Sequence, residues 1–208
     1  MNRITLVIIV AICMFTSCTK NSAVVDIVDE GALNAVMSLK DDRQFVNSYT
    51  LLQPAEKAEL WSRHIKYFIQ SHDLSLEQLA FVTSFRSQWI VKDLFEKNSP
   101  LLKTFALSLP QIRFKAIILL GIPDASSLFI DLQSDRLYYL VKNNTNTIIN
   151  VPGEANKYRS NSNYCKCSQT DPYCNTGTCT SNGCTREAGC GTLWLFECNG
   201  VCQLLADS

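Results

Sequence analysis

The sequence has little of what enzymes and nucleic-acid-binding proteins need. Its 208 residues include only two histidines, His64 and His72, whose spacing of eight residues does not match the i, i+4 spacing of a paired metal site on a helix. No G-x-S-x-G, H-E-x-x-H or glycine-rich phosphate loop is present. Nineteen basic residues balance 19 acidic ones, and no basic block occurs. We therefore predict a protein that is not an enzyme, holds no cofactor or metal, and binds no nucleic acid.

Long apolar runs are also lacking. The run from Ile4 to Phe15 has twelve residues and that from Ala116 to Ile122 has seven, whereas a membrane-spanning helix needs roughly 20. We therefore expect no segment that crosses a bilayer. Because Arg3 precedes it, the first run has the charge and length of a signal-peptide core.

The end of that run, Phe15-Thr16-Ser17-Cys18, resembles the bacterial lipobox, in which small residues precede a cysteine that is lipidated and becomes the new amino terminus. We predict a lipoprotein signal peptide over residues 1–17, lipidation at Cys18, and a polar tether over 18–28. A lipid on Cys18 would make a membrane surface one partner and place the protein in the bacterial cell envelope. The alternative is an ordinary signal peptide with a chance cysteine at its end.

Residues 29–150 contain no cysteine, and their apolar residues recur at helical spacing. Pro54 suits the first turn of a helix, where its missing N–H is not needed, and Ser75 with Gln78 forms a capping box that opens the next helix. The apolar faces of these two helices are Ala58, Trp61, Ile65 and Phe68 in the first and Leu79, Val82, Phe85 and Trp89 in the second.

Weaker patterns complete this region. Further helices are predicted over 32–48, 101–109 and 110–120, the last ending at Gly121 and Pro123 in the usual order of helix-stop residues. A hairpin could cover residues 136–151. We predict a small helical domain over 29–150.

A polar segment over 151–163, VPGEANKYRSNSN, follows and is typical of an exposed linker. Lys157 and Arg159 lie within it and would suit a trypsin-like protease. Cleavage there and an intact linker are equally compatible with this composition.

Residues 164–208 hold eight of the ten cysteines. An even number packed this densely indicates four disulfides, each worth roughly 3 kcal/mol in a segment with few apolar residues of its own. The alternative to disulfides is a zinc site, but there is no C-x-x-C pair and both histidines lie far upstream. The spacing does not select a pairing. The cysteines are Cys165, Cys167, Cys174, Cys179, Cys184, Cys190, Cys198 and Cys202.

A candidate contact patch lies in the same segment: Leu193, Trp194, Leu195 and Phe196. Strand-like alternation would turn two of these side chains inward and two outward, where they could bind a partner. The favoured alternative is that all four form the core. Two basic against four acidic residues give residues 164–208 a net charge of −2, which disfavours non-specific lysis of anionic membranes.

Several features of this end occur together: a C-x-C start, Asp171 before Tyr173-Cys174, Gly189-Cys190-Gly191-Thr192-Leu193-Trp194, and Cys198-Asn199-Gly200-Val201-Cys202. They resemble the bacteriocin fulvocin C-related proteins. That resemblance implies an exported leader, a helical region and a terminal cysteine-rich module that harms related bacteria.

Together, the sequence predicts a mainly α-helical domain plus a small disulfide-rich C-terminal module with little regular secondary structure. The first functional hypothesis is an exported bacteriocin-like precursor whose module is released outside the cell and acts on competitor bacteria. The second is a membrane-anchored envelope lipoprotein whose module binds an unknown protein or envelope receptor without killing. A third is a protease inhibitor that presents the loop over 175–181.

Overall fold

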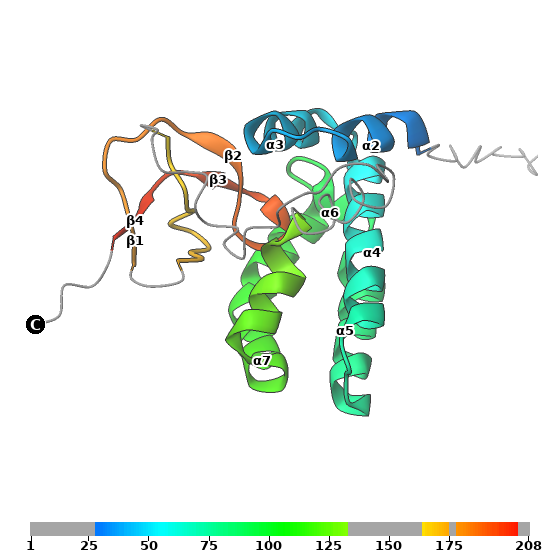
Figure 1. The fold of residues 1–208 in the computed structure, drawn as a ribbon. Coiled ribbons are helices and arrows are strands. Elements are labelled where there is room, and N and C mark those ends of the chain that lie inside the picture. The colour runs from blue at the N-terminus through cyan, green and yellow to red at the C-terminus, as the bar shows by residue number, and fades with distance from the viewer. Residues whose placement is uncertain (1–27, 133–163, 175–177, 204–208) are drawn as a thin grey trace, which may run out of the picture.

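The computed structural model describes residues 28–132, 164–174 and 178–203. The first range is helical, and the chain then enters a small module of short strands (Figure 1). The helices are α2 (Glu30–Met37), α3 (Asp42–Leu51), α4 (Pro54–Ser71), α5 (Leu76–Trp89), α6 (Lys92–Phe95) and α7 (Pro100–Ile130). The helices α2 and α3 lie across one end of the longer helices α4, α5 and α7 (Figure 1).

The starts of α4 and α5 confirm the prediction made from their capping residues. Pro54 occupies the first turn of α4, and the backbone N–H of Gln53 before it donates to Glu56 Oε2 at 2.7 Å. At α5, Ser75 and Gln78 form the reciprocal pair, with N–H to side-chain distances of 2.8 and 3.3 Å. Each cap satisfies backbone donors that the first helical turn leaves free.

Two predicted helix boundaries are wrong. The helix expected over 32–48 is divided into α2 and α3, because the Asp41 side chain accepts from Gln44 N at 2.8 Å and starts a new helix there. The helices expected over 101–109 and 110–120 are one uninterrupted stretch at the start of α7, with no break at Pro110. Pro110 has no N–H to donate to the Ala106 carbonyl. Both residues are exposed, so water can replace the lost hydrogen bond.

The expected helix stop at Gly121 is confirmed, because the regular helix that starts at Pro100 ends there. Gly121 has φ +80° and ψ 166°, a conformation that glycine adopts without strain, and the helix resumes after this kink with Pro123 in its first turn. By length and composition alone α7 could cross a membrane, with a mean hydropathy of 1.5 over an 18-residue stretch. One face of α7 packs in the core of the protein, and the expectation that no segment crosses a bilayer stays a prediction.

The helical core is built around α4. Trp61 and Ile65 of α4 are fully buried, as are Phe45 of α3 and Phe105 of α7. Phe85 of α5 packs edge-on against Phe129 of α7, with ring centroids 5.1 Å apart. The four helices therefore share one apolar interior.

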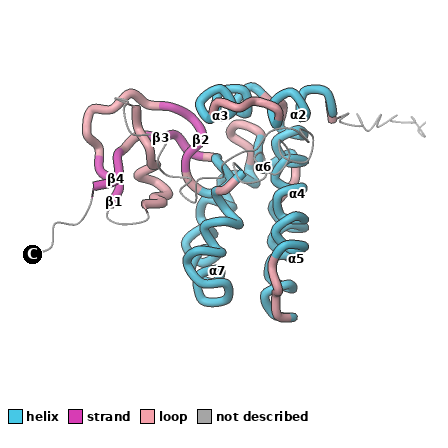
Figure 2. Tube along the Cα trace, viewed as in Figure 1, coloured by secondary structure: helices cyan, strands magenta, loops and turns pink. Residues whose placement is uncertain are grey.

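The C-terminal module has four short strands: β1 (Thr178–Thr180), β2 (Glu187–Cys190), β3 (Phe196–Cys198) and β4 (Val201–Gln203). They pair antiparallel as β1 with β4 and β2 with β3, and loops make up most of the rest (Figure 2). The predicted fold class is confirmed. The leader, the tether, the hairpin over 136–151 and the linker over 151–163 lie outside the described residues.

Candidate functional site: the junction of helices and module

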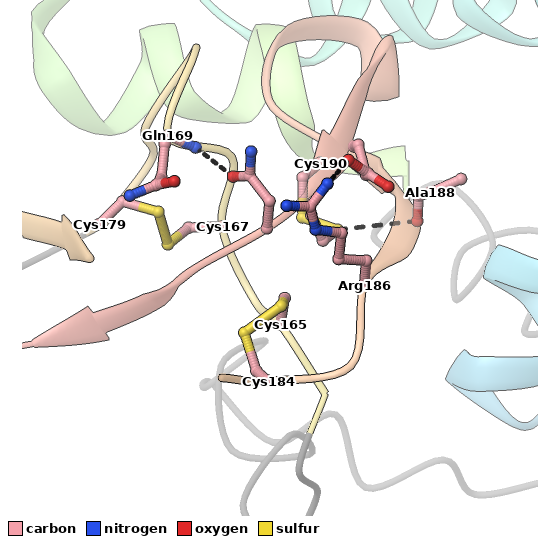
Figure 3. Close-up of a disulfide and its surroundings, with 11 residues drawn as sticks. Cys165, Cys167, Gln169, Cys179, Cys184, Arg186, Ala188 and Cys190 are labelled. Atoms are coloured by element: carbon pink, nitrogen blue, oxygen red, sulfur yellow. Dashed lines mark hydrogen bonds and ion pairs between the residues drawn. A yellow bond between two sulfur atoms is a disulfide. The ribbon is translucent and has the colours of Figure 1, made fainter. Parts of the chain in front are cut away.

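Four disulfides hold the module together, as predicted from the cysteine count. They join Cys165 to Cys184, Cys167 to Cys179, Cys174 to Cys202 and Cys190 to Cys198. The first two bridges start from Cys165 and Cys167, on the chain segment that enters the module (Figure 3). All eight predicted cysteines are used.

Among the described residues, the sulfurs of Cys167, Cys174 and Cys202 lie within 4.8 Å of one another. This is the spacing of a metal-binding cluster. However, each sulfur is already bonded to another sulfur, and metal binding requires thiolates. In the oxidised module this cluster has no ligand to offer.

The hairpin β2–β3 points one apolar turn at the helices. The Cys190–Cys198 disulfide closes this hairpin, and the turn between its strands, Thr192–Trp194, is a short 3-10 segment. Leu193 and Trp194 both have positive φ, 56° and 54°, which is uncommon outside glycine and is held by the surrounding contacts. The strand β2 contacts α3, and the turn contacts α7.

Trp194 lies in an aromatic cage made by α3 and α4. Its ring centroid is 5.6 Å from that of Phe45, 5.1 Å from that of Tyr49 and 6.4 Å from that of Trp61, all in edge-on geometry. Its indole N–H donates to the carbonyl of Ile130, at the end of α7, at 2.9 Å. Trp194 is 9% exposed and Leu193 is fully buried. The module thus contributes its largest apolar side chain to the core of the helices.

Tyr49 connects the two parts through its hydroxyl. That hydroxyl accepts from Trp61 Nε1 at 2.9 Å and donates to the Leu193 carbonyl at 3.4 Å. Burial raises the pKa of Tyr49 well above its ordinary value. The phenol therefore stays neutral and its hydrogen bond to the module persists over the whole physiological pH range.

An ion pair fixes the opposite edge of the junction. Arg113 of α7 donates to Asp171 Oδ1 at 2.7 Å and to the Pro172 carbonyl at 3.0 Å. The Asp171 side chain is 1% exposed, and its other oxygen accepts from the backbone N–H of Thr192. The same carboxylate therefore positions the turn before Trp194 and binds the helix.

Arg113 also lies over the ring of Tyr173, 4.2 Å from its centroid. The Tyr173 hydroxyl is 2.9 Å from Thr192 Oγ1. Burial, the main cause, raises the pKa of Tyr173 to about 12. Arg43 and Glu187 form a further contact at 3.4 Å, with exposed fractions of 56% and 28%, and a pair this exposed contributes little.

The predicted contact patch needs correction. Leu193 and Trp194 are buried, and Leu195 and Phe196 are half-buried against the same core, so the patch is not an exposed surface in the intact chain. The physical reason is that the module has almost no apolar core of its own: its separate buried cluster consists of cysteines. The helices supply the missing interior, and the alternative that all four residues are core describes the structure better.

Other residues considered from the sequence have local contacts. His64 is buried with Nε2 3.0 Å from the Ser127 carbonyl, and His72 stacks on Phe68 with centroids 4.0 Å apart. Sequence reasoning missed Arg113, Tyr49 and the role of Asp171, and no motif surrounds Arg113 that could have identified it. Cys18 lies outside the described residues, and its lipidation stays a prediction.

Comparison of the chain with protein-family models, with curated proteins and with solved structures gives no match. Four disulfides by themselves indicate an oxidising location, outside the cytoplasm.

Proposed function

We propose that the chain is an exported bacteriocin-like precursor in which the helices cover the apolar turn of a disulfide-stapled module until the module is released to act on competitor bacteria. The burial of Trp194 among Phe45, Tyr49 and Trp61 is the observation that carries this proposal. The resemblance of the cysteine-rich motifs to the fulvocin C-related proteins supports it. In the intact chain Leu193 is fully buried and Trp194 is 9% exposed, so the helices cover this turn.

Release in this scheme requires two events. Cleavage within 151–163 breaks the covalent connection, but the Trp194 cage and the buried Arg113–Asp171 pair remain. The module must then separate from the helices, for example when a target competes for the same apolar turn. A cut chain that has not separated stays inactive.

The separated module would present a compact apolar surface. Leu193 and Trp194 would lose their cover, and the half-buried Leu195 and Phe196 lie beside them. The four disulfides maintain the shape of the module after the shared core is lost. Because its net charge is −2, the module fits an envelope receptor on the target cell better than a purely anionic membrane.

The test uses the whole oxidised chain with a specific protease site inserted within 151–163. Killing of related strains is measured for the intact chain, the cut chain and the cut chain carrying Trp194→Ala, with Trp194→Phe as the matched variant. We expect killing only after cutting, loss of killing with alanine, and retention of most killing with phenylalanine. Equal activity of the intact chain, or inactivity of every form, would overturn the proposal.

A second candidate is a membrane-anchored envelope lipoprotein that binds a partner without killing. The shared core favours it, because Trp194 and the buried Arg113–Asp171 pair join helices and module into one body. Native mass spectrometry of the cut chain separates the two candidates. A module that stays bound to the helices in the presence of susceptible cells supports the lipoprotein, whereas a free module supports the precursor.

A further inference from the structure

The outer surface of α7 is unusually apolar. Of the nine exposed large apolar residues in the described part of the chain, five lie on this helix. They are Leu107, Phe114, Ile117, Ile118 and Ile122, with exposed fractions of 84%, 67%, 40%, 64% and 67%. We call this set the α7 apolar face.

Before the kink at Gly121, the α7 apolar face forms one stripe along the helix. Leu107, Phe114 and Ile118 follow at spacings of seven and four residues, which places them on the same side. The opposite side carries the buried Phe105 and Ala116. The helix is therefore apolar on both sides, although only one side is used by the core.

Two neighbouring features enlarge this surface. Gln78 Nε2 donates to the Leu119 carbonyl at 2.7 Å, so the start of α5, with Leu76 87% exposed, lies beside this part of α7. On the module side, a groove of about 330 Å³ runs between α7 and the module. Its apolar lining includes Pro110, Phe114 and Phe196. The apolar surface thus continues to the edge of the module.

The charge of α7 is of one sign up to Pro123, and its single acidic residue, Asp124, lies beyond the kink at Gly121. Residues 100–123 contain Lys103, Arg113 and Lys115 and no acidic residue. Arg113 is bound to Asp171, whereas Lys103 and Lys115 are exposed. An apolar stripe flanked by exposed lysines is the pattern of helices that lie in the interface of an anionic bilayer.

We propose that the α7 apolar face, with Lys103 and Lys115, docks on the surface of an anionic phospholipid bilayer, with α7 lying in the plane of the membrane. The charge distribution favours a bilayer over a second copy of this chain, because two such faces would bring Lys103 and Lys115 of each copy together with only Asp124 of each α7 to pair with them. One weak attachment is reversible. A lipid on Cys18 would supply the second attachment that stable anchoring needs.

The test uses a chain without the predicted lipid anchor on Cys18, so that binding through α7 is measured alone. The oxidised chain from residue 18, carrying Cys18→Ser, is sedimented with vesicles of phosphatidylcholine alone or mixed with phosphatidylglycerol. Phe114→Ser with Ile118→Ser should weaken binding to the anionic vesicles by about tenfold or more, since two apolar anchors are lost. The control pair Leu51→Ser with Val91→Ser changes apolar residues that are 81% and 38% exposed on other parts of the surface and should leave binding within about twofold.

The charge is tested in the same assay. Lys103→Gln with Lys115→Gln should weaken binding to anionic vesicles and make the remaining binding insensitive to salt. The control pair Lys66→Gln with Lys97→Gln removes exposed lysines elsewhere and should have a smaller effect. Near-ultraviolet circular dichroism of each variant shows whether it is folded.

Three results would overturn the proposal. The first is no binding to anionic vesicles by the folded parent chain. The second is binding that none of the α7 variants weakens. The third is concentration-dependent dimerisation, seen by light scattering and abolished by Phe114→Ser with Ile118→Ser, which would assign the face to a second copy. Since killing is not measured, the outcome is independent of the proposed function.

Discussion

The indole N–H of Trp194 donates to the main-chain carbonyl of Ile130 at 2.9 Å, joining the tip of the disulfide module to the last turn of α7. The carbonyls at the end of a helix have no partner within the helix. One side chain of the module therefore satisfies the helix terminus and fills the aromatic cage beneath it. This contact makes the helices and the module depend on each other for stability.

We expect Trp194→Ala to lower the free energy of unfolding by about 4 kcal/mol, because it removes a buried aromatic ring and leaves a cavity. Trp194→Phe keeps most of the ring volume and loses the hydrogen bond to Ile130, so its cost should be about 1–2 kcal/mol. Urea unfolding of the oxidised chain, followed by circular dichroism of the helices, measures both. If alanine were no worse than phenylalanine, Trp194 would not be packed in the helical core.

The Arg113–Asp171 pair gives the second prediction. Replacing Arg113 by methionine leaves a carboxylate that is 1% exposed without its cation, and breaking a buried pair in this way costs about 3 kcal/mol. The double change Arg113→Met with Asp171→Asn removes the orphaned charge while the amide oxygen can still accept from Thr192 N. We expect the double variant to be more stable than Arg113→Met alone in urea unfolding. If the double variant lost as much stability as the sum of the two single changes, the two side chains would not interact.

Alkaline pH gives the third prediction. In the unfolded chain Tyr173 ionises near its ordinary pKa of 10.0, whereas burial raises the folded pKa to about 12. Between these values the unfolded state has lost a proton that the folded state retains, so the contribution of Tyr173 to stability is constant below about pH 10 and falls as the pH rises toward 12. Tyr173→Phe should flatten this fall by on the order of 2 kcal/mol. Brief urea unfolding measurements across that range, before disulfides exchange, would test it, and an unchanged slope would contradict it.

Local signals in the sequence predicted the helix starts and the use of all eight cysteines. Pro54 and the Ser75–Gln78 cap act within one turn of a helix, so their effect can be inferred without knowing the fold. The count of cysteines predicts bridges, but their pairing depends on how the strands meet. Eight cysteines can form four bridges in many different pairings.

The junction could not be predicted, because its contacts join residues far apart in the chain. Asp171 lies 58 residues from Arg113, and Trp194 lies 64 residues from Ile130. No sequence pattern around any of these residues indicates its partner. The apolar run at Trp194 indicated burial without indicating that the covering residues would be helical. Likewise, Pro110 is a helix-stop signal that α7 overrides, since the core it joins stabilises the continued helix, whereas Gly121 does interrupt the helix.

Gly191 gives the last prediction, with Gly183 as its matched control. Both have positive φ, 71° and 63°, so alanine at either position costs about 1 kcal/mol from backbone strain. A Cβ at Gly191 would lie 2.7 Å from Phe196 Cδ2 and 2.9 Å from Asp171 Oδ2, whereas one at Gly183 meets nothing within 4 Å. Gly191→Ala should therefore displace the carboxylate that binds Arg113 and Thr192, and destabilise the chain by roughly 2 kcal/mol more than Gly183→Ala. If Gly191→Ala and Gly183→Ala lowered stability equally in urea unfolding, the turn before Trp194 would tolerate a side chain. Asp171 would then not be what holds this turn against α7.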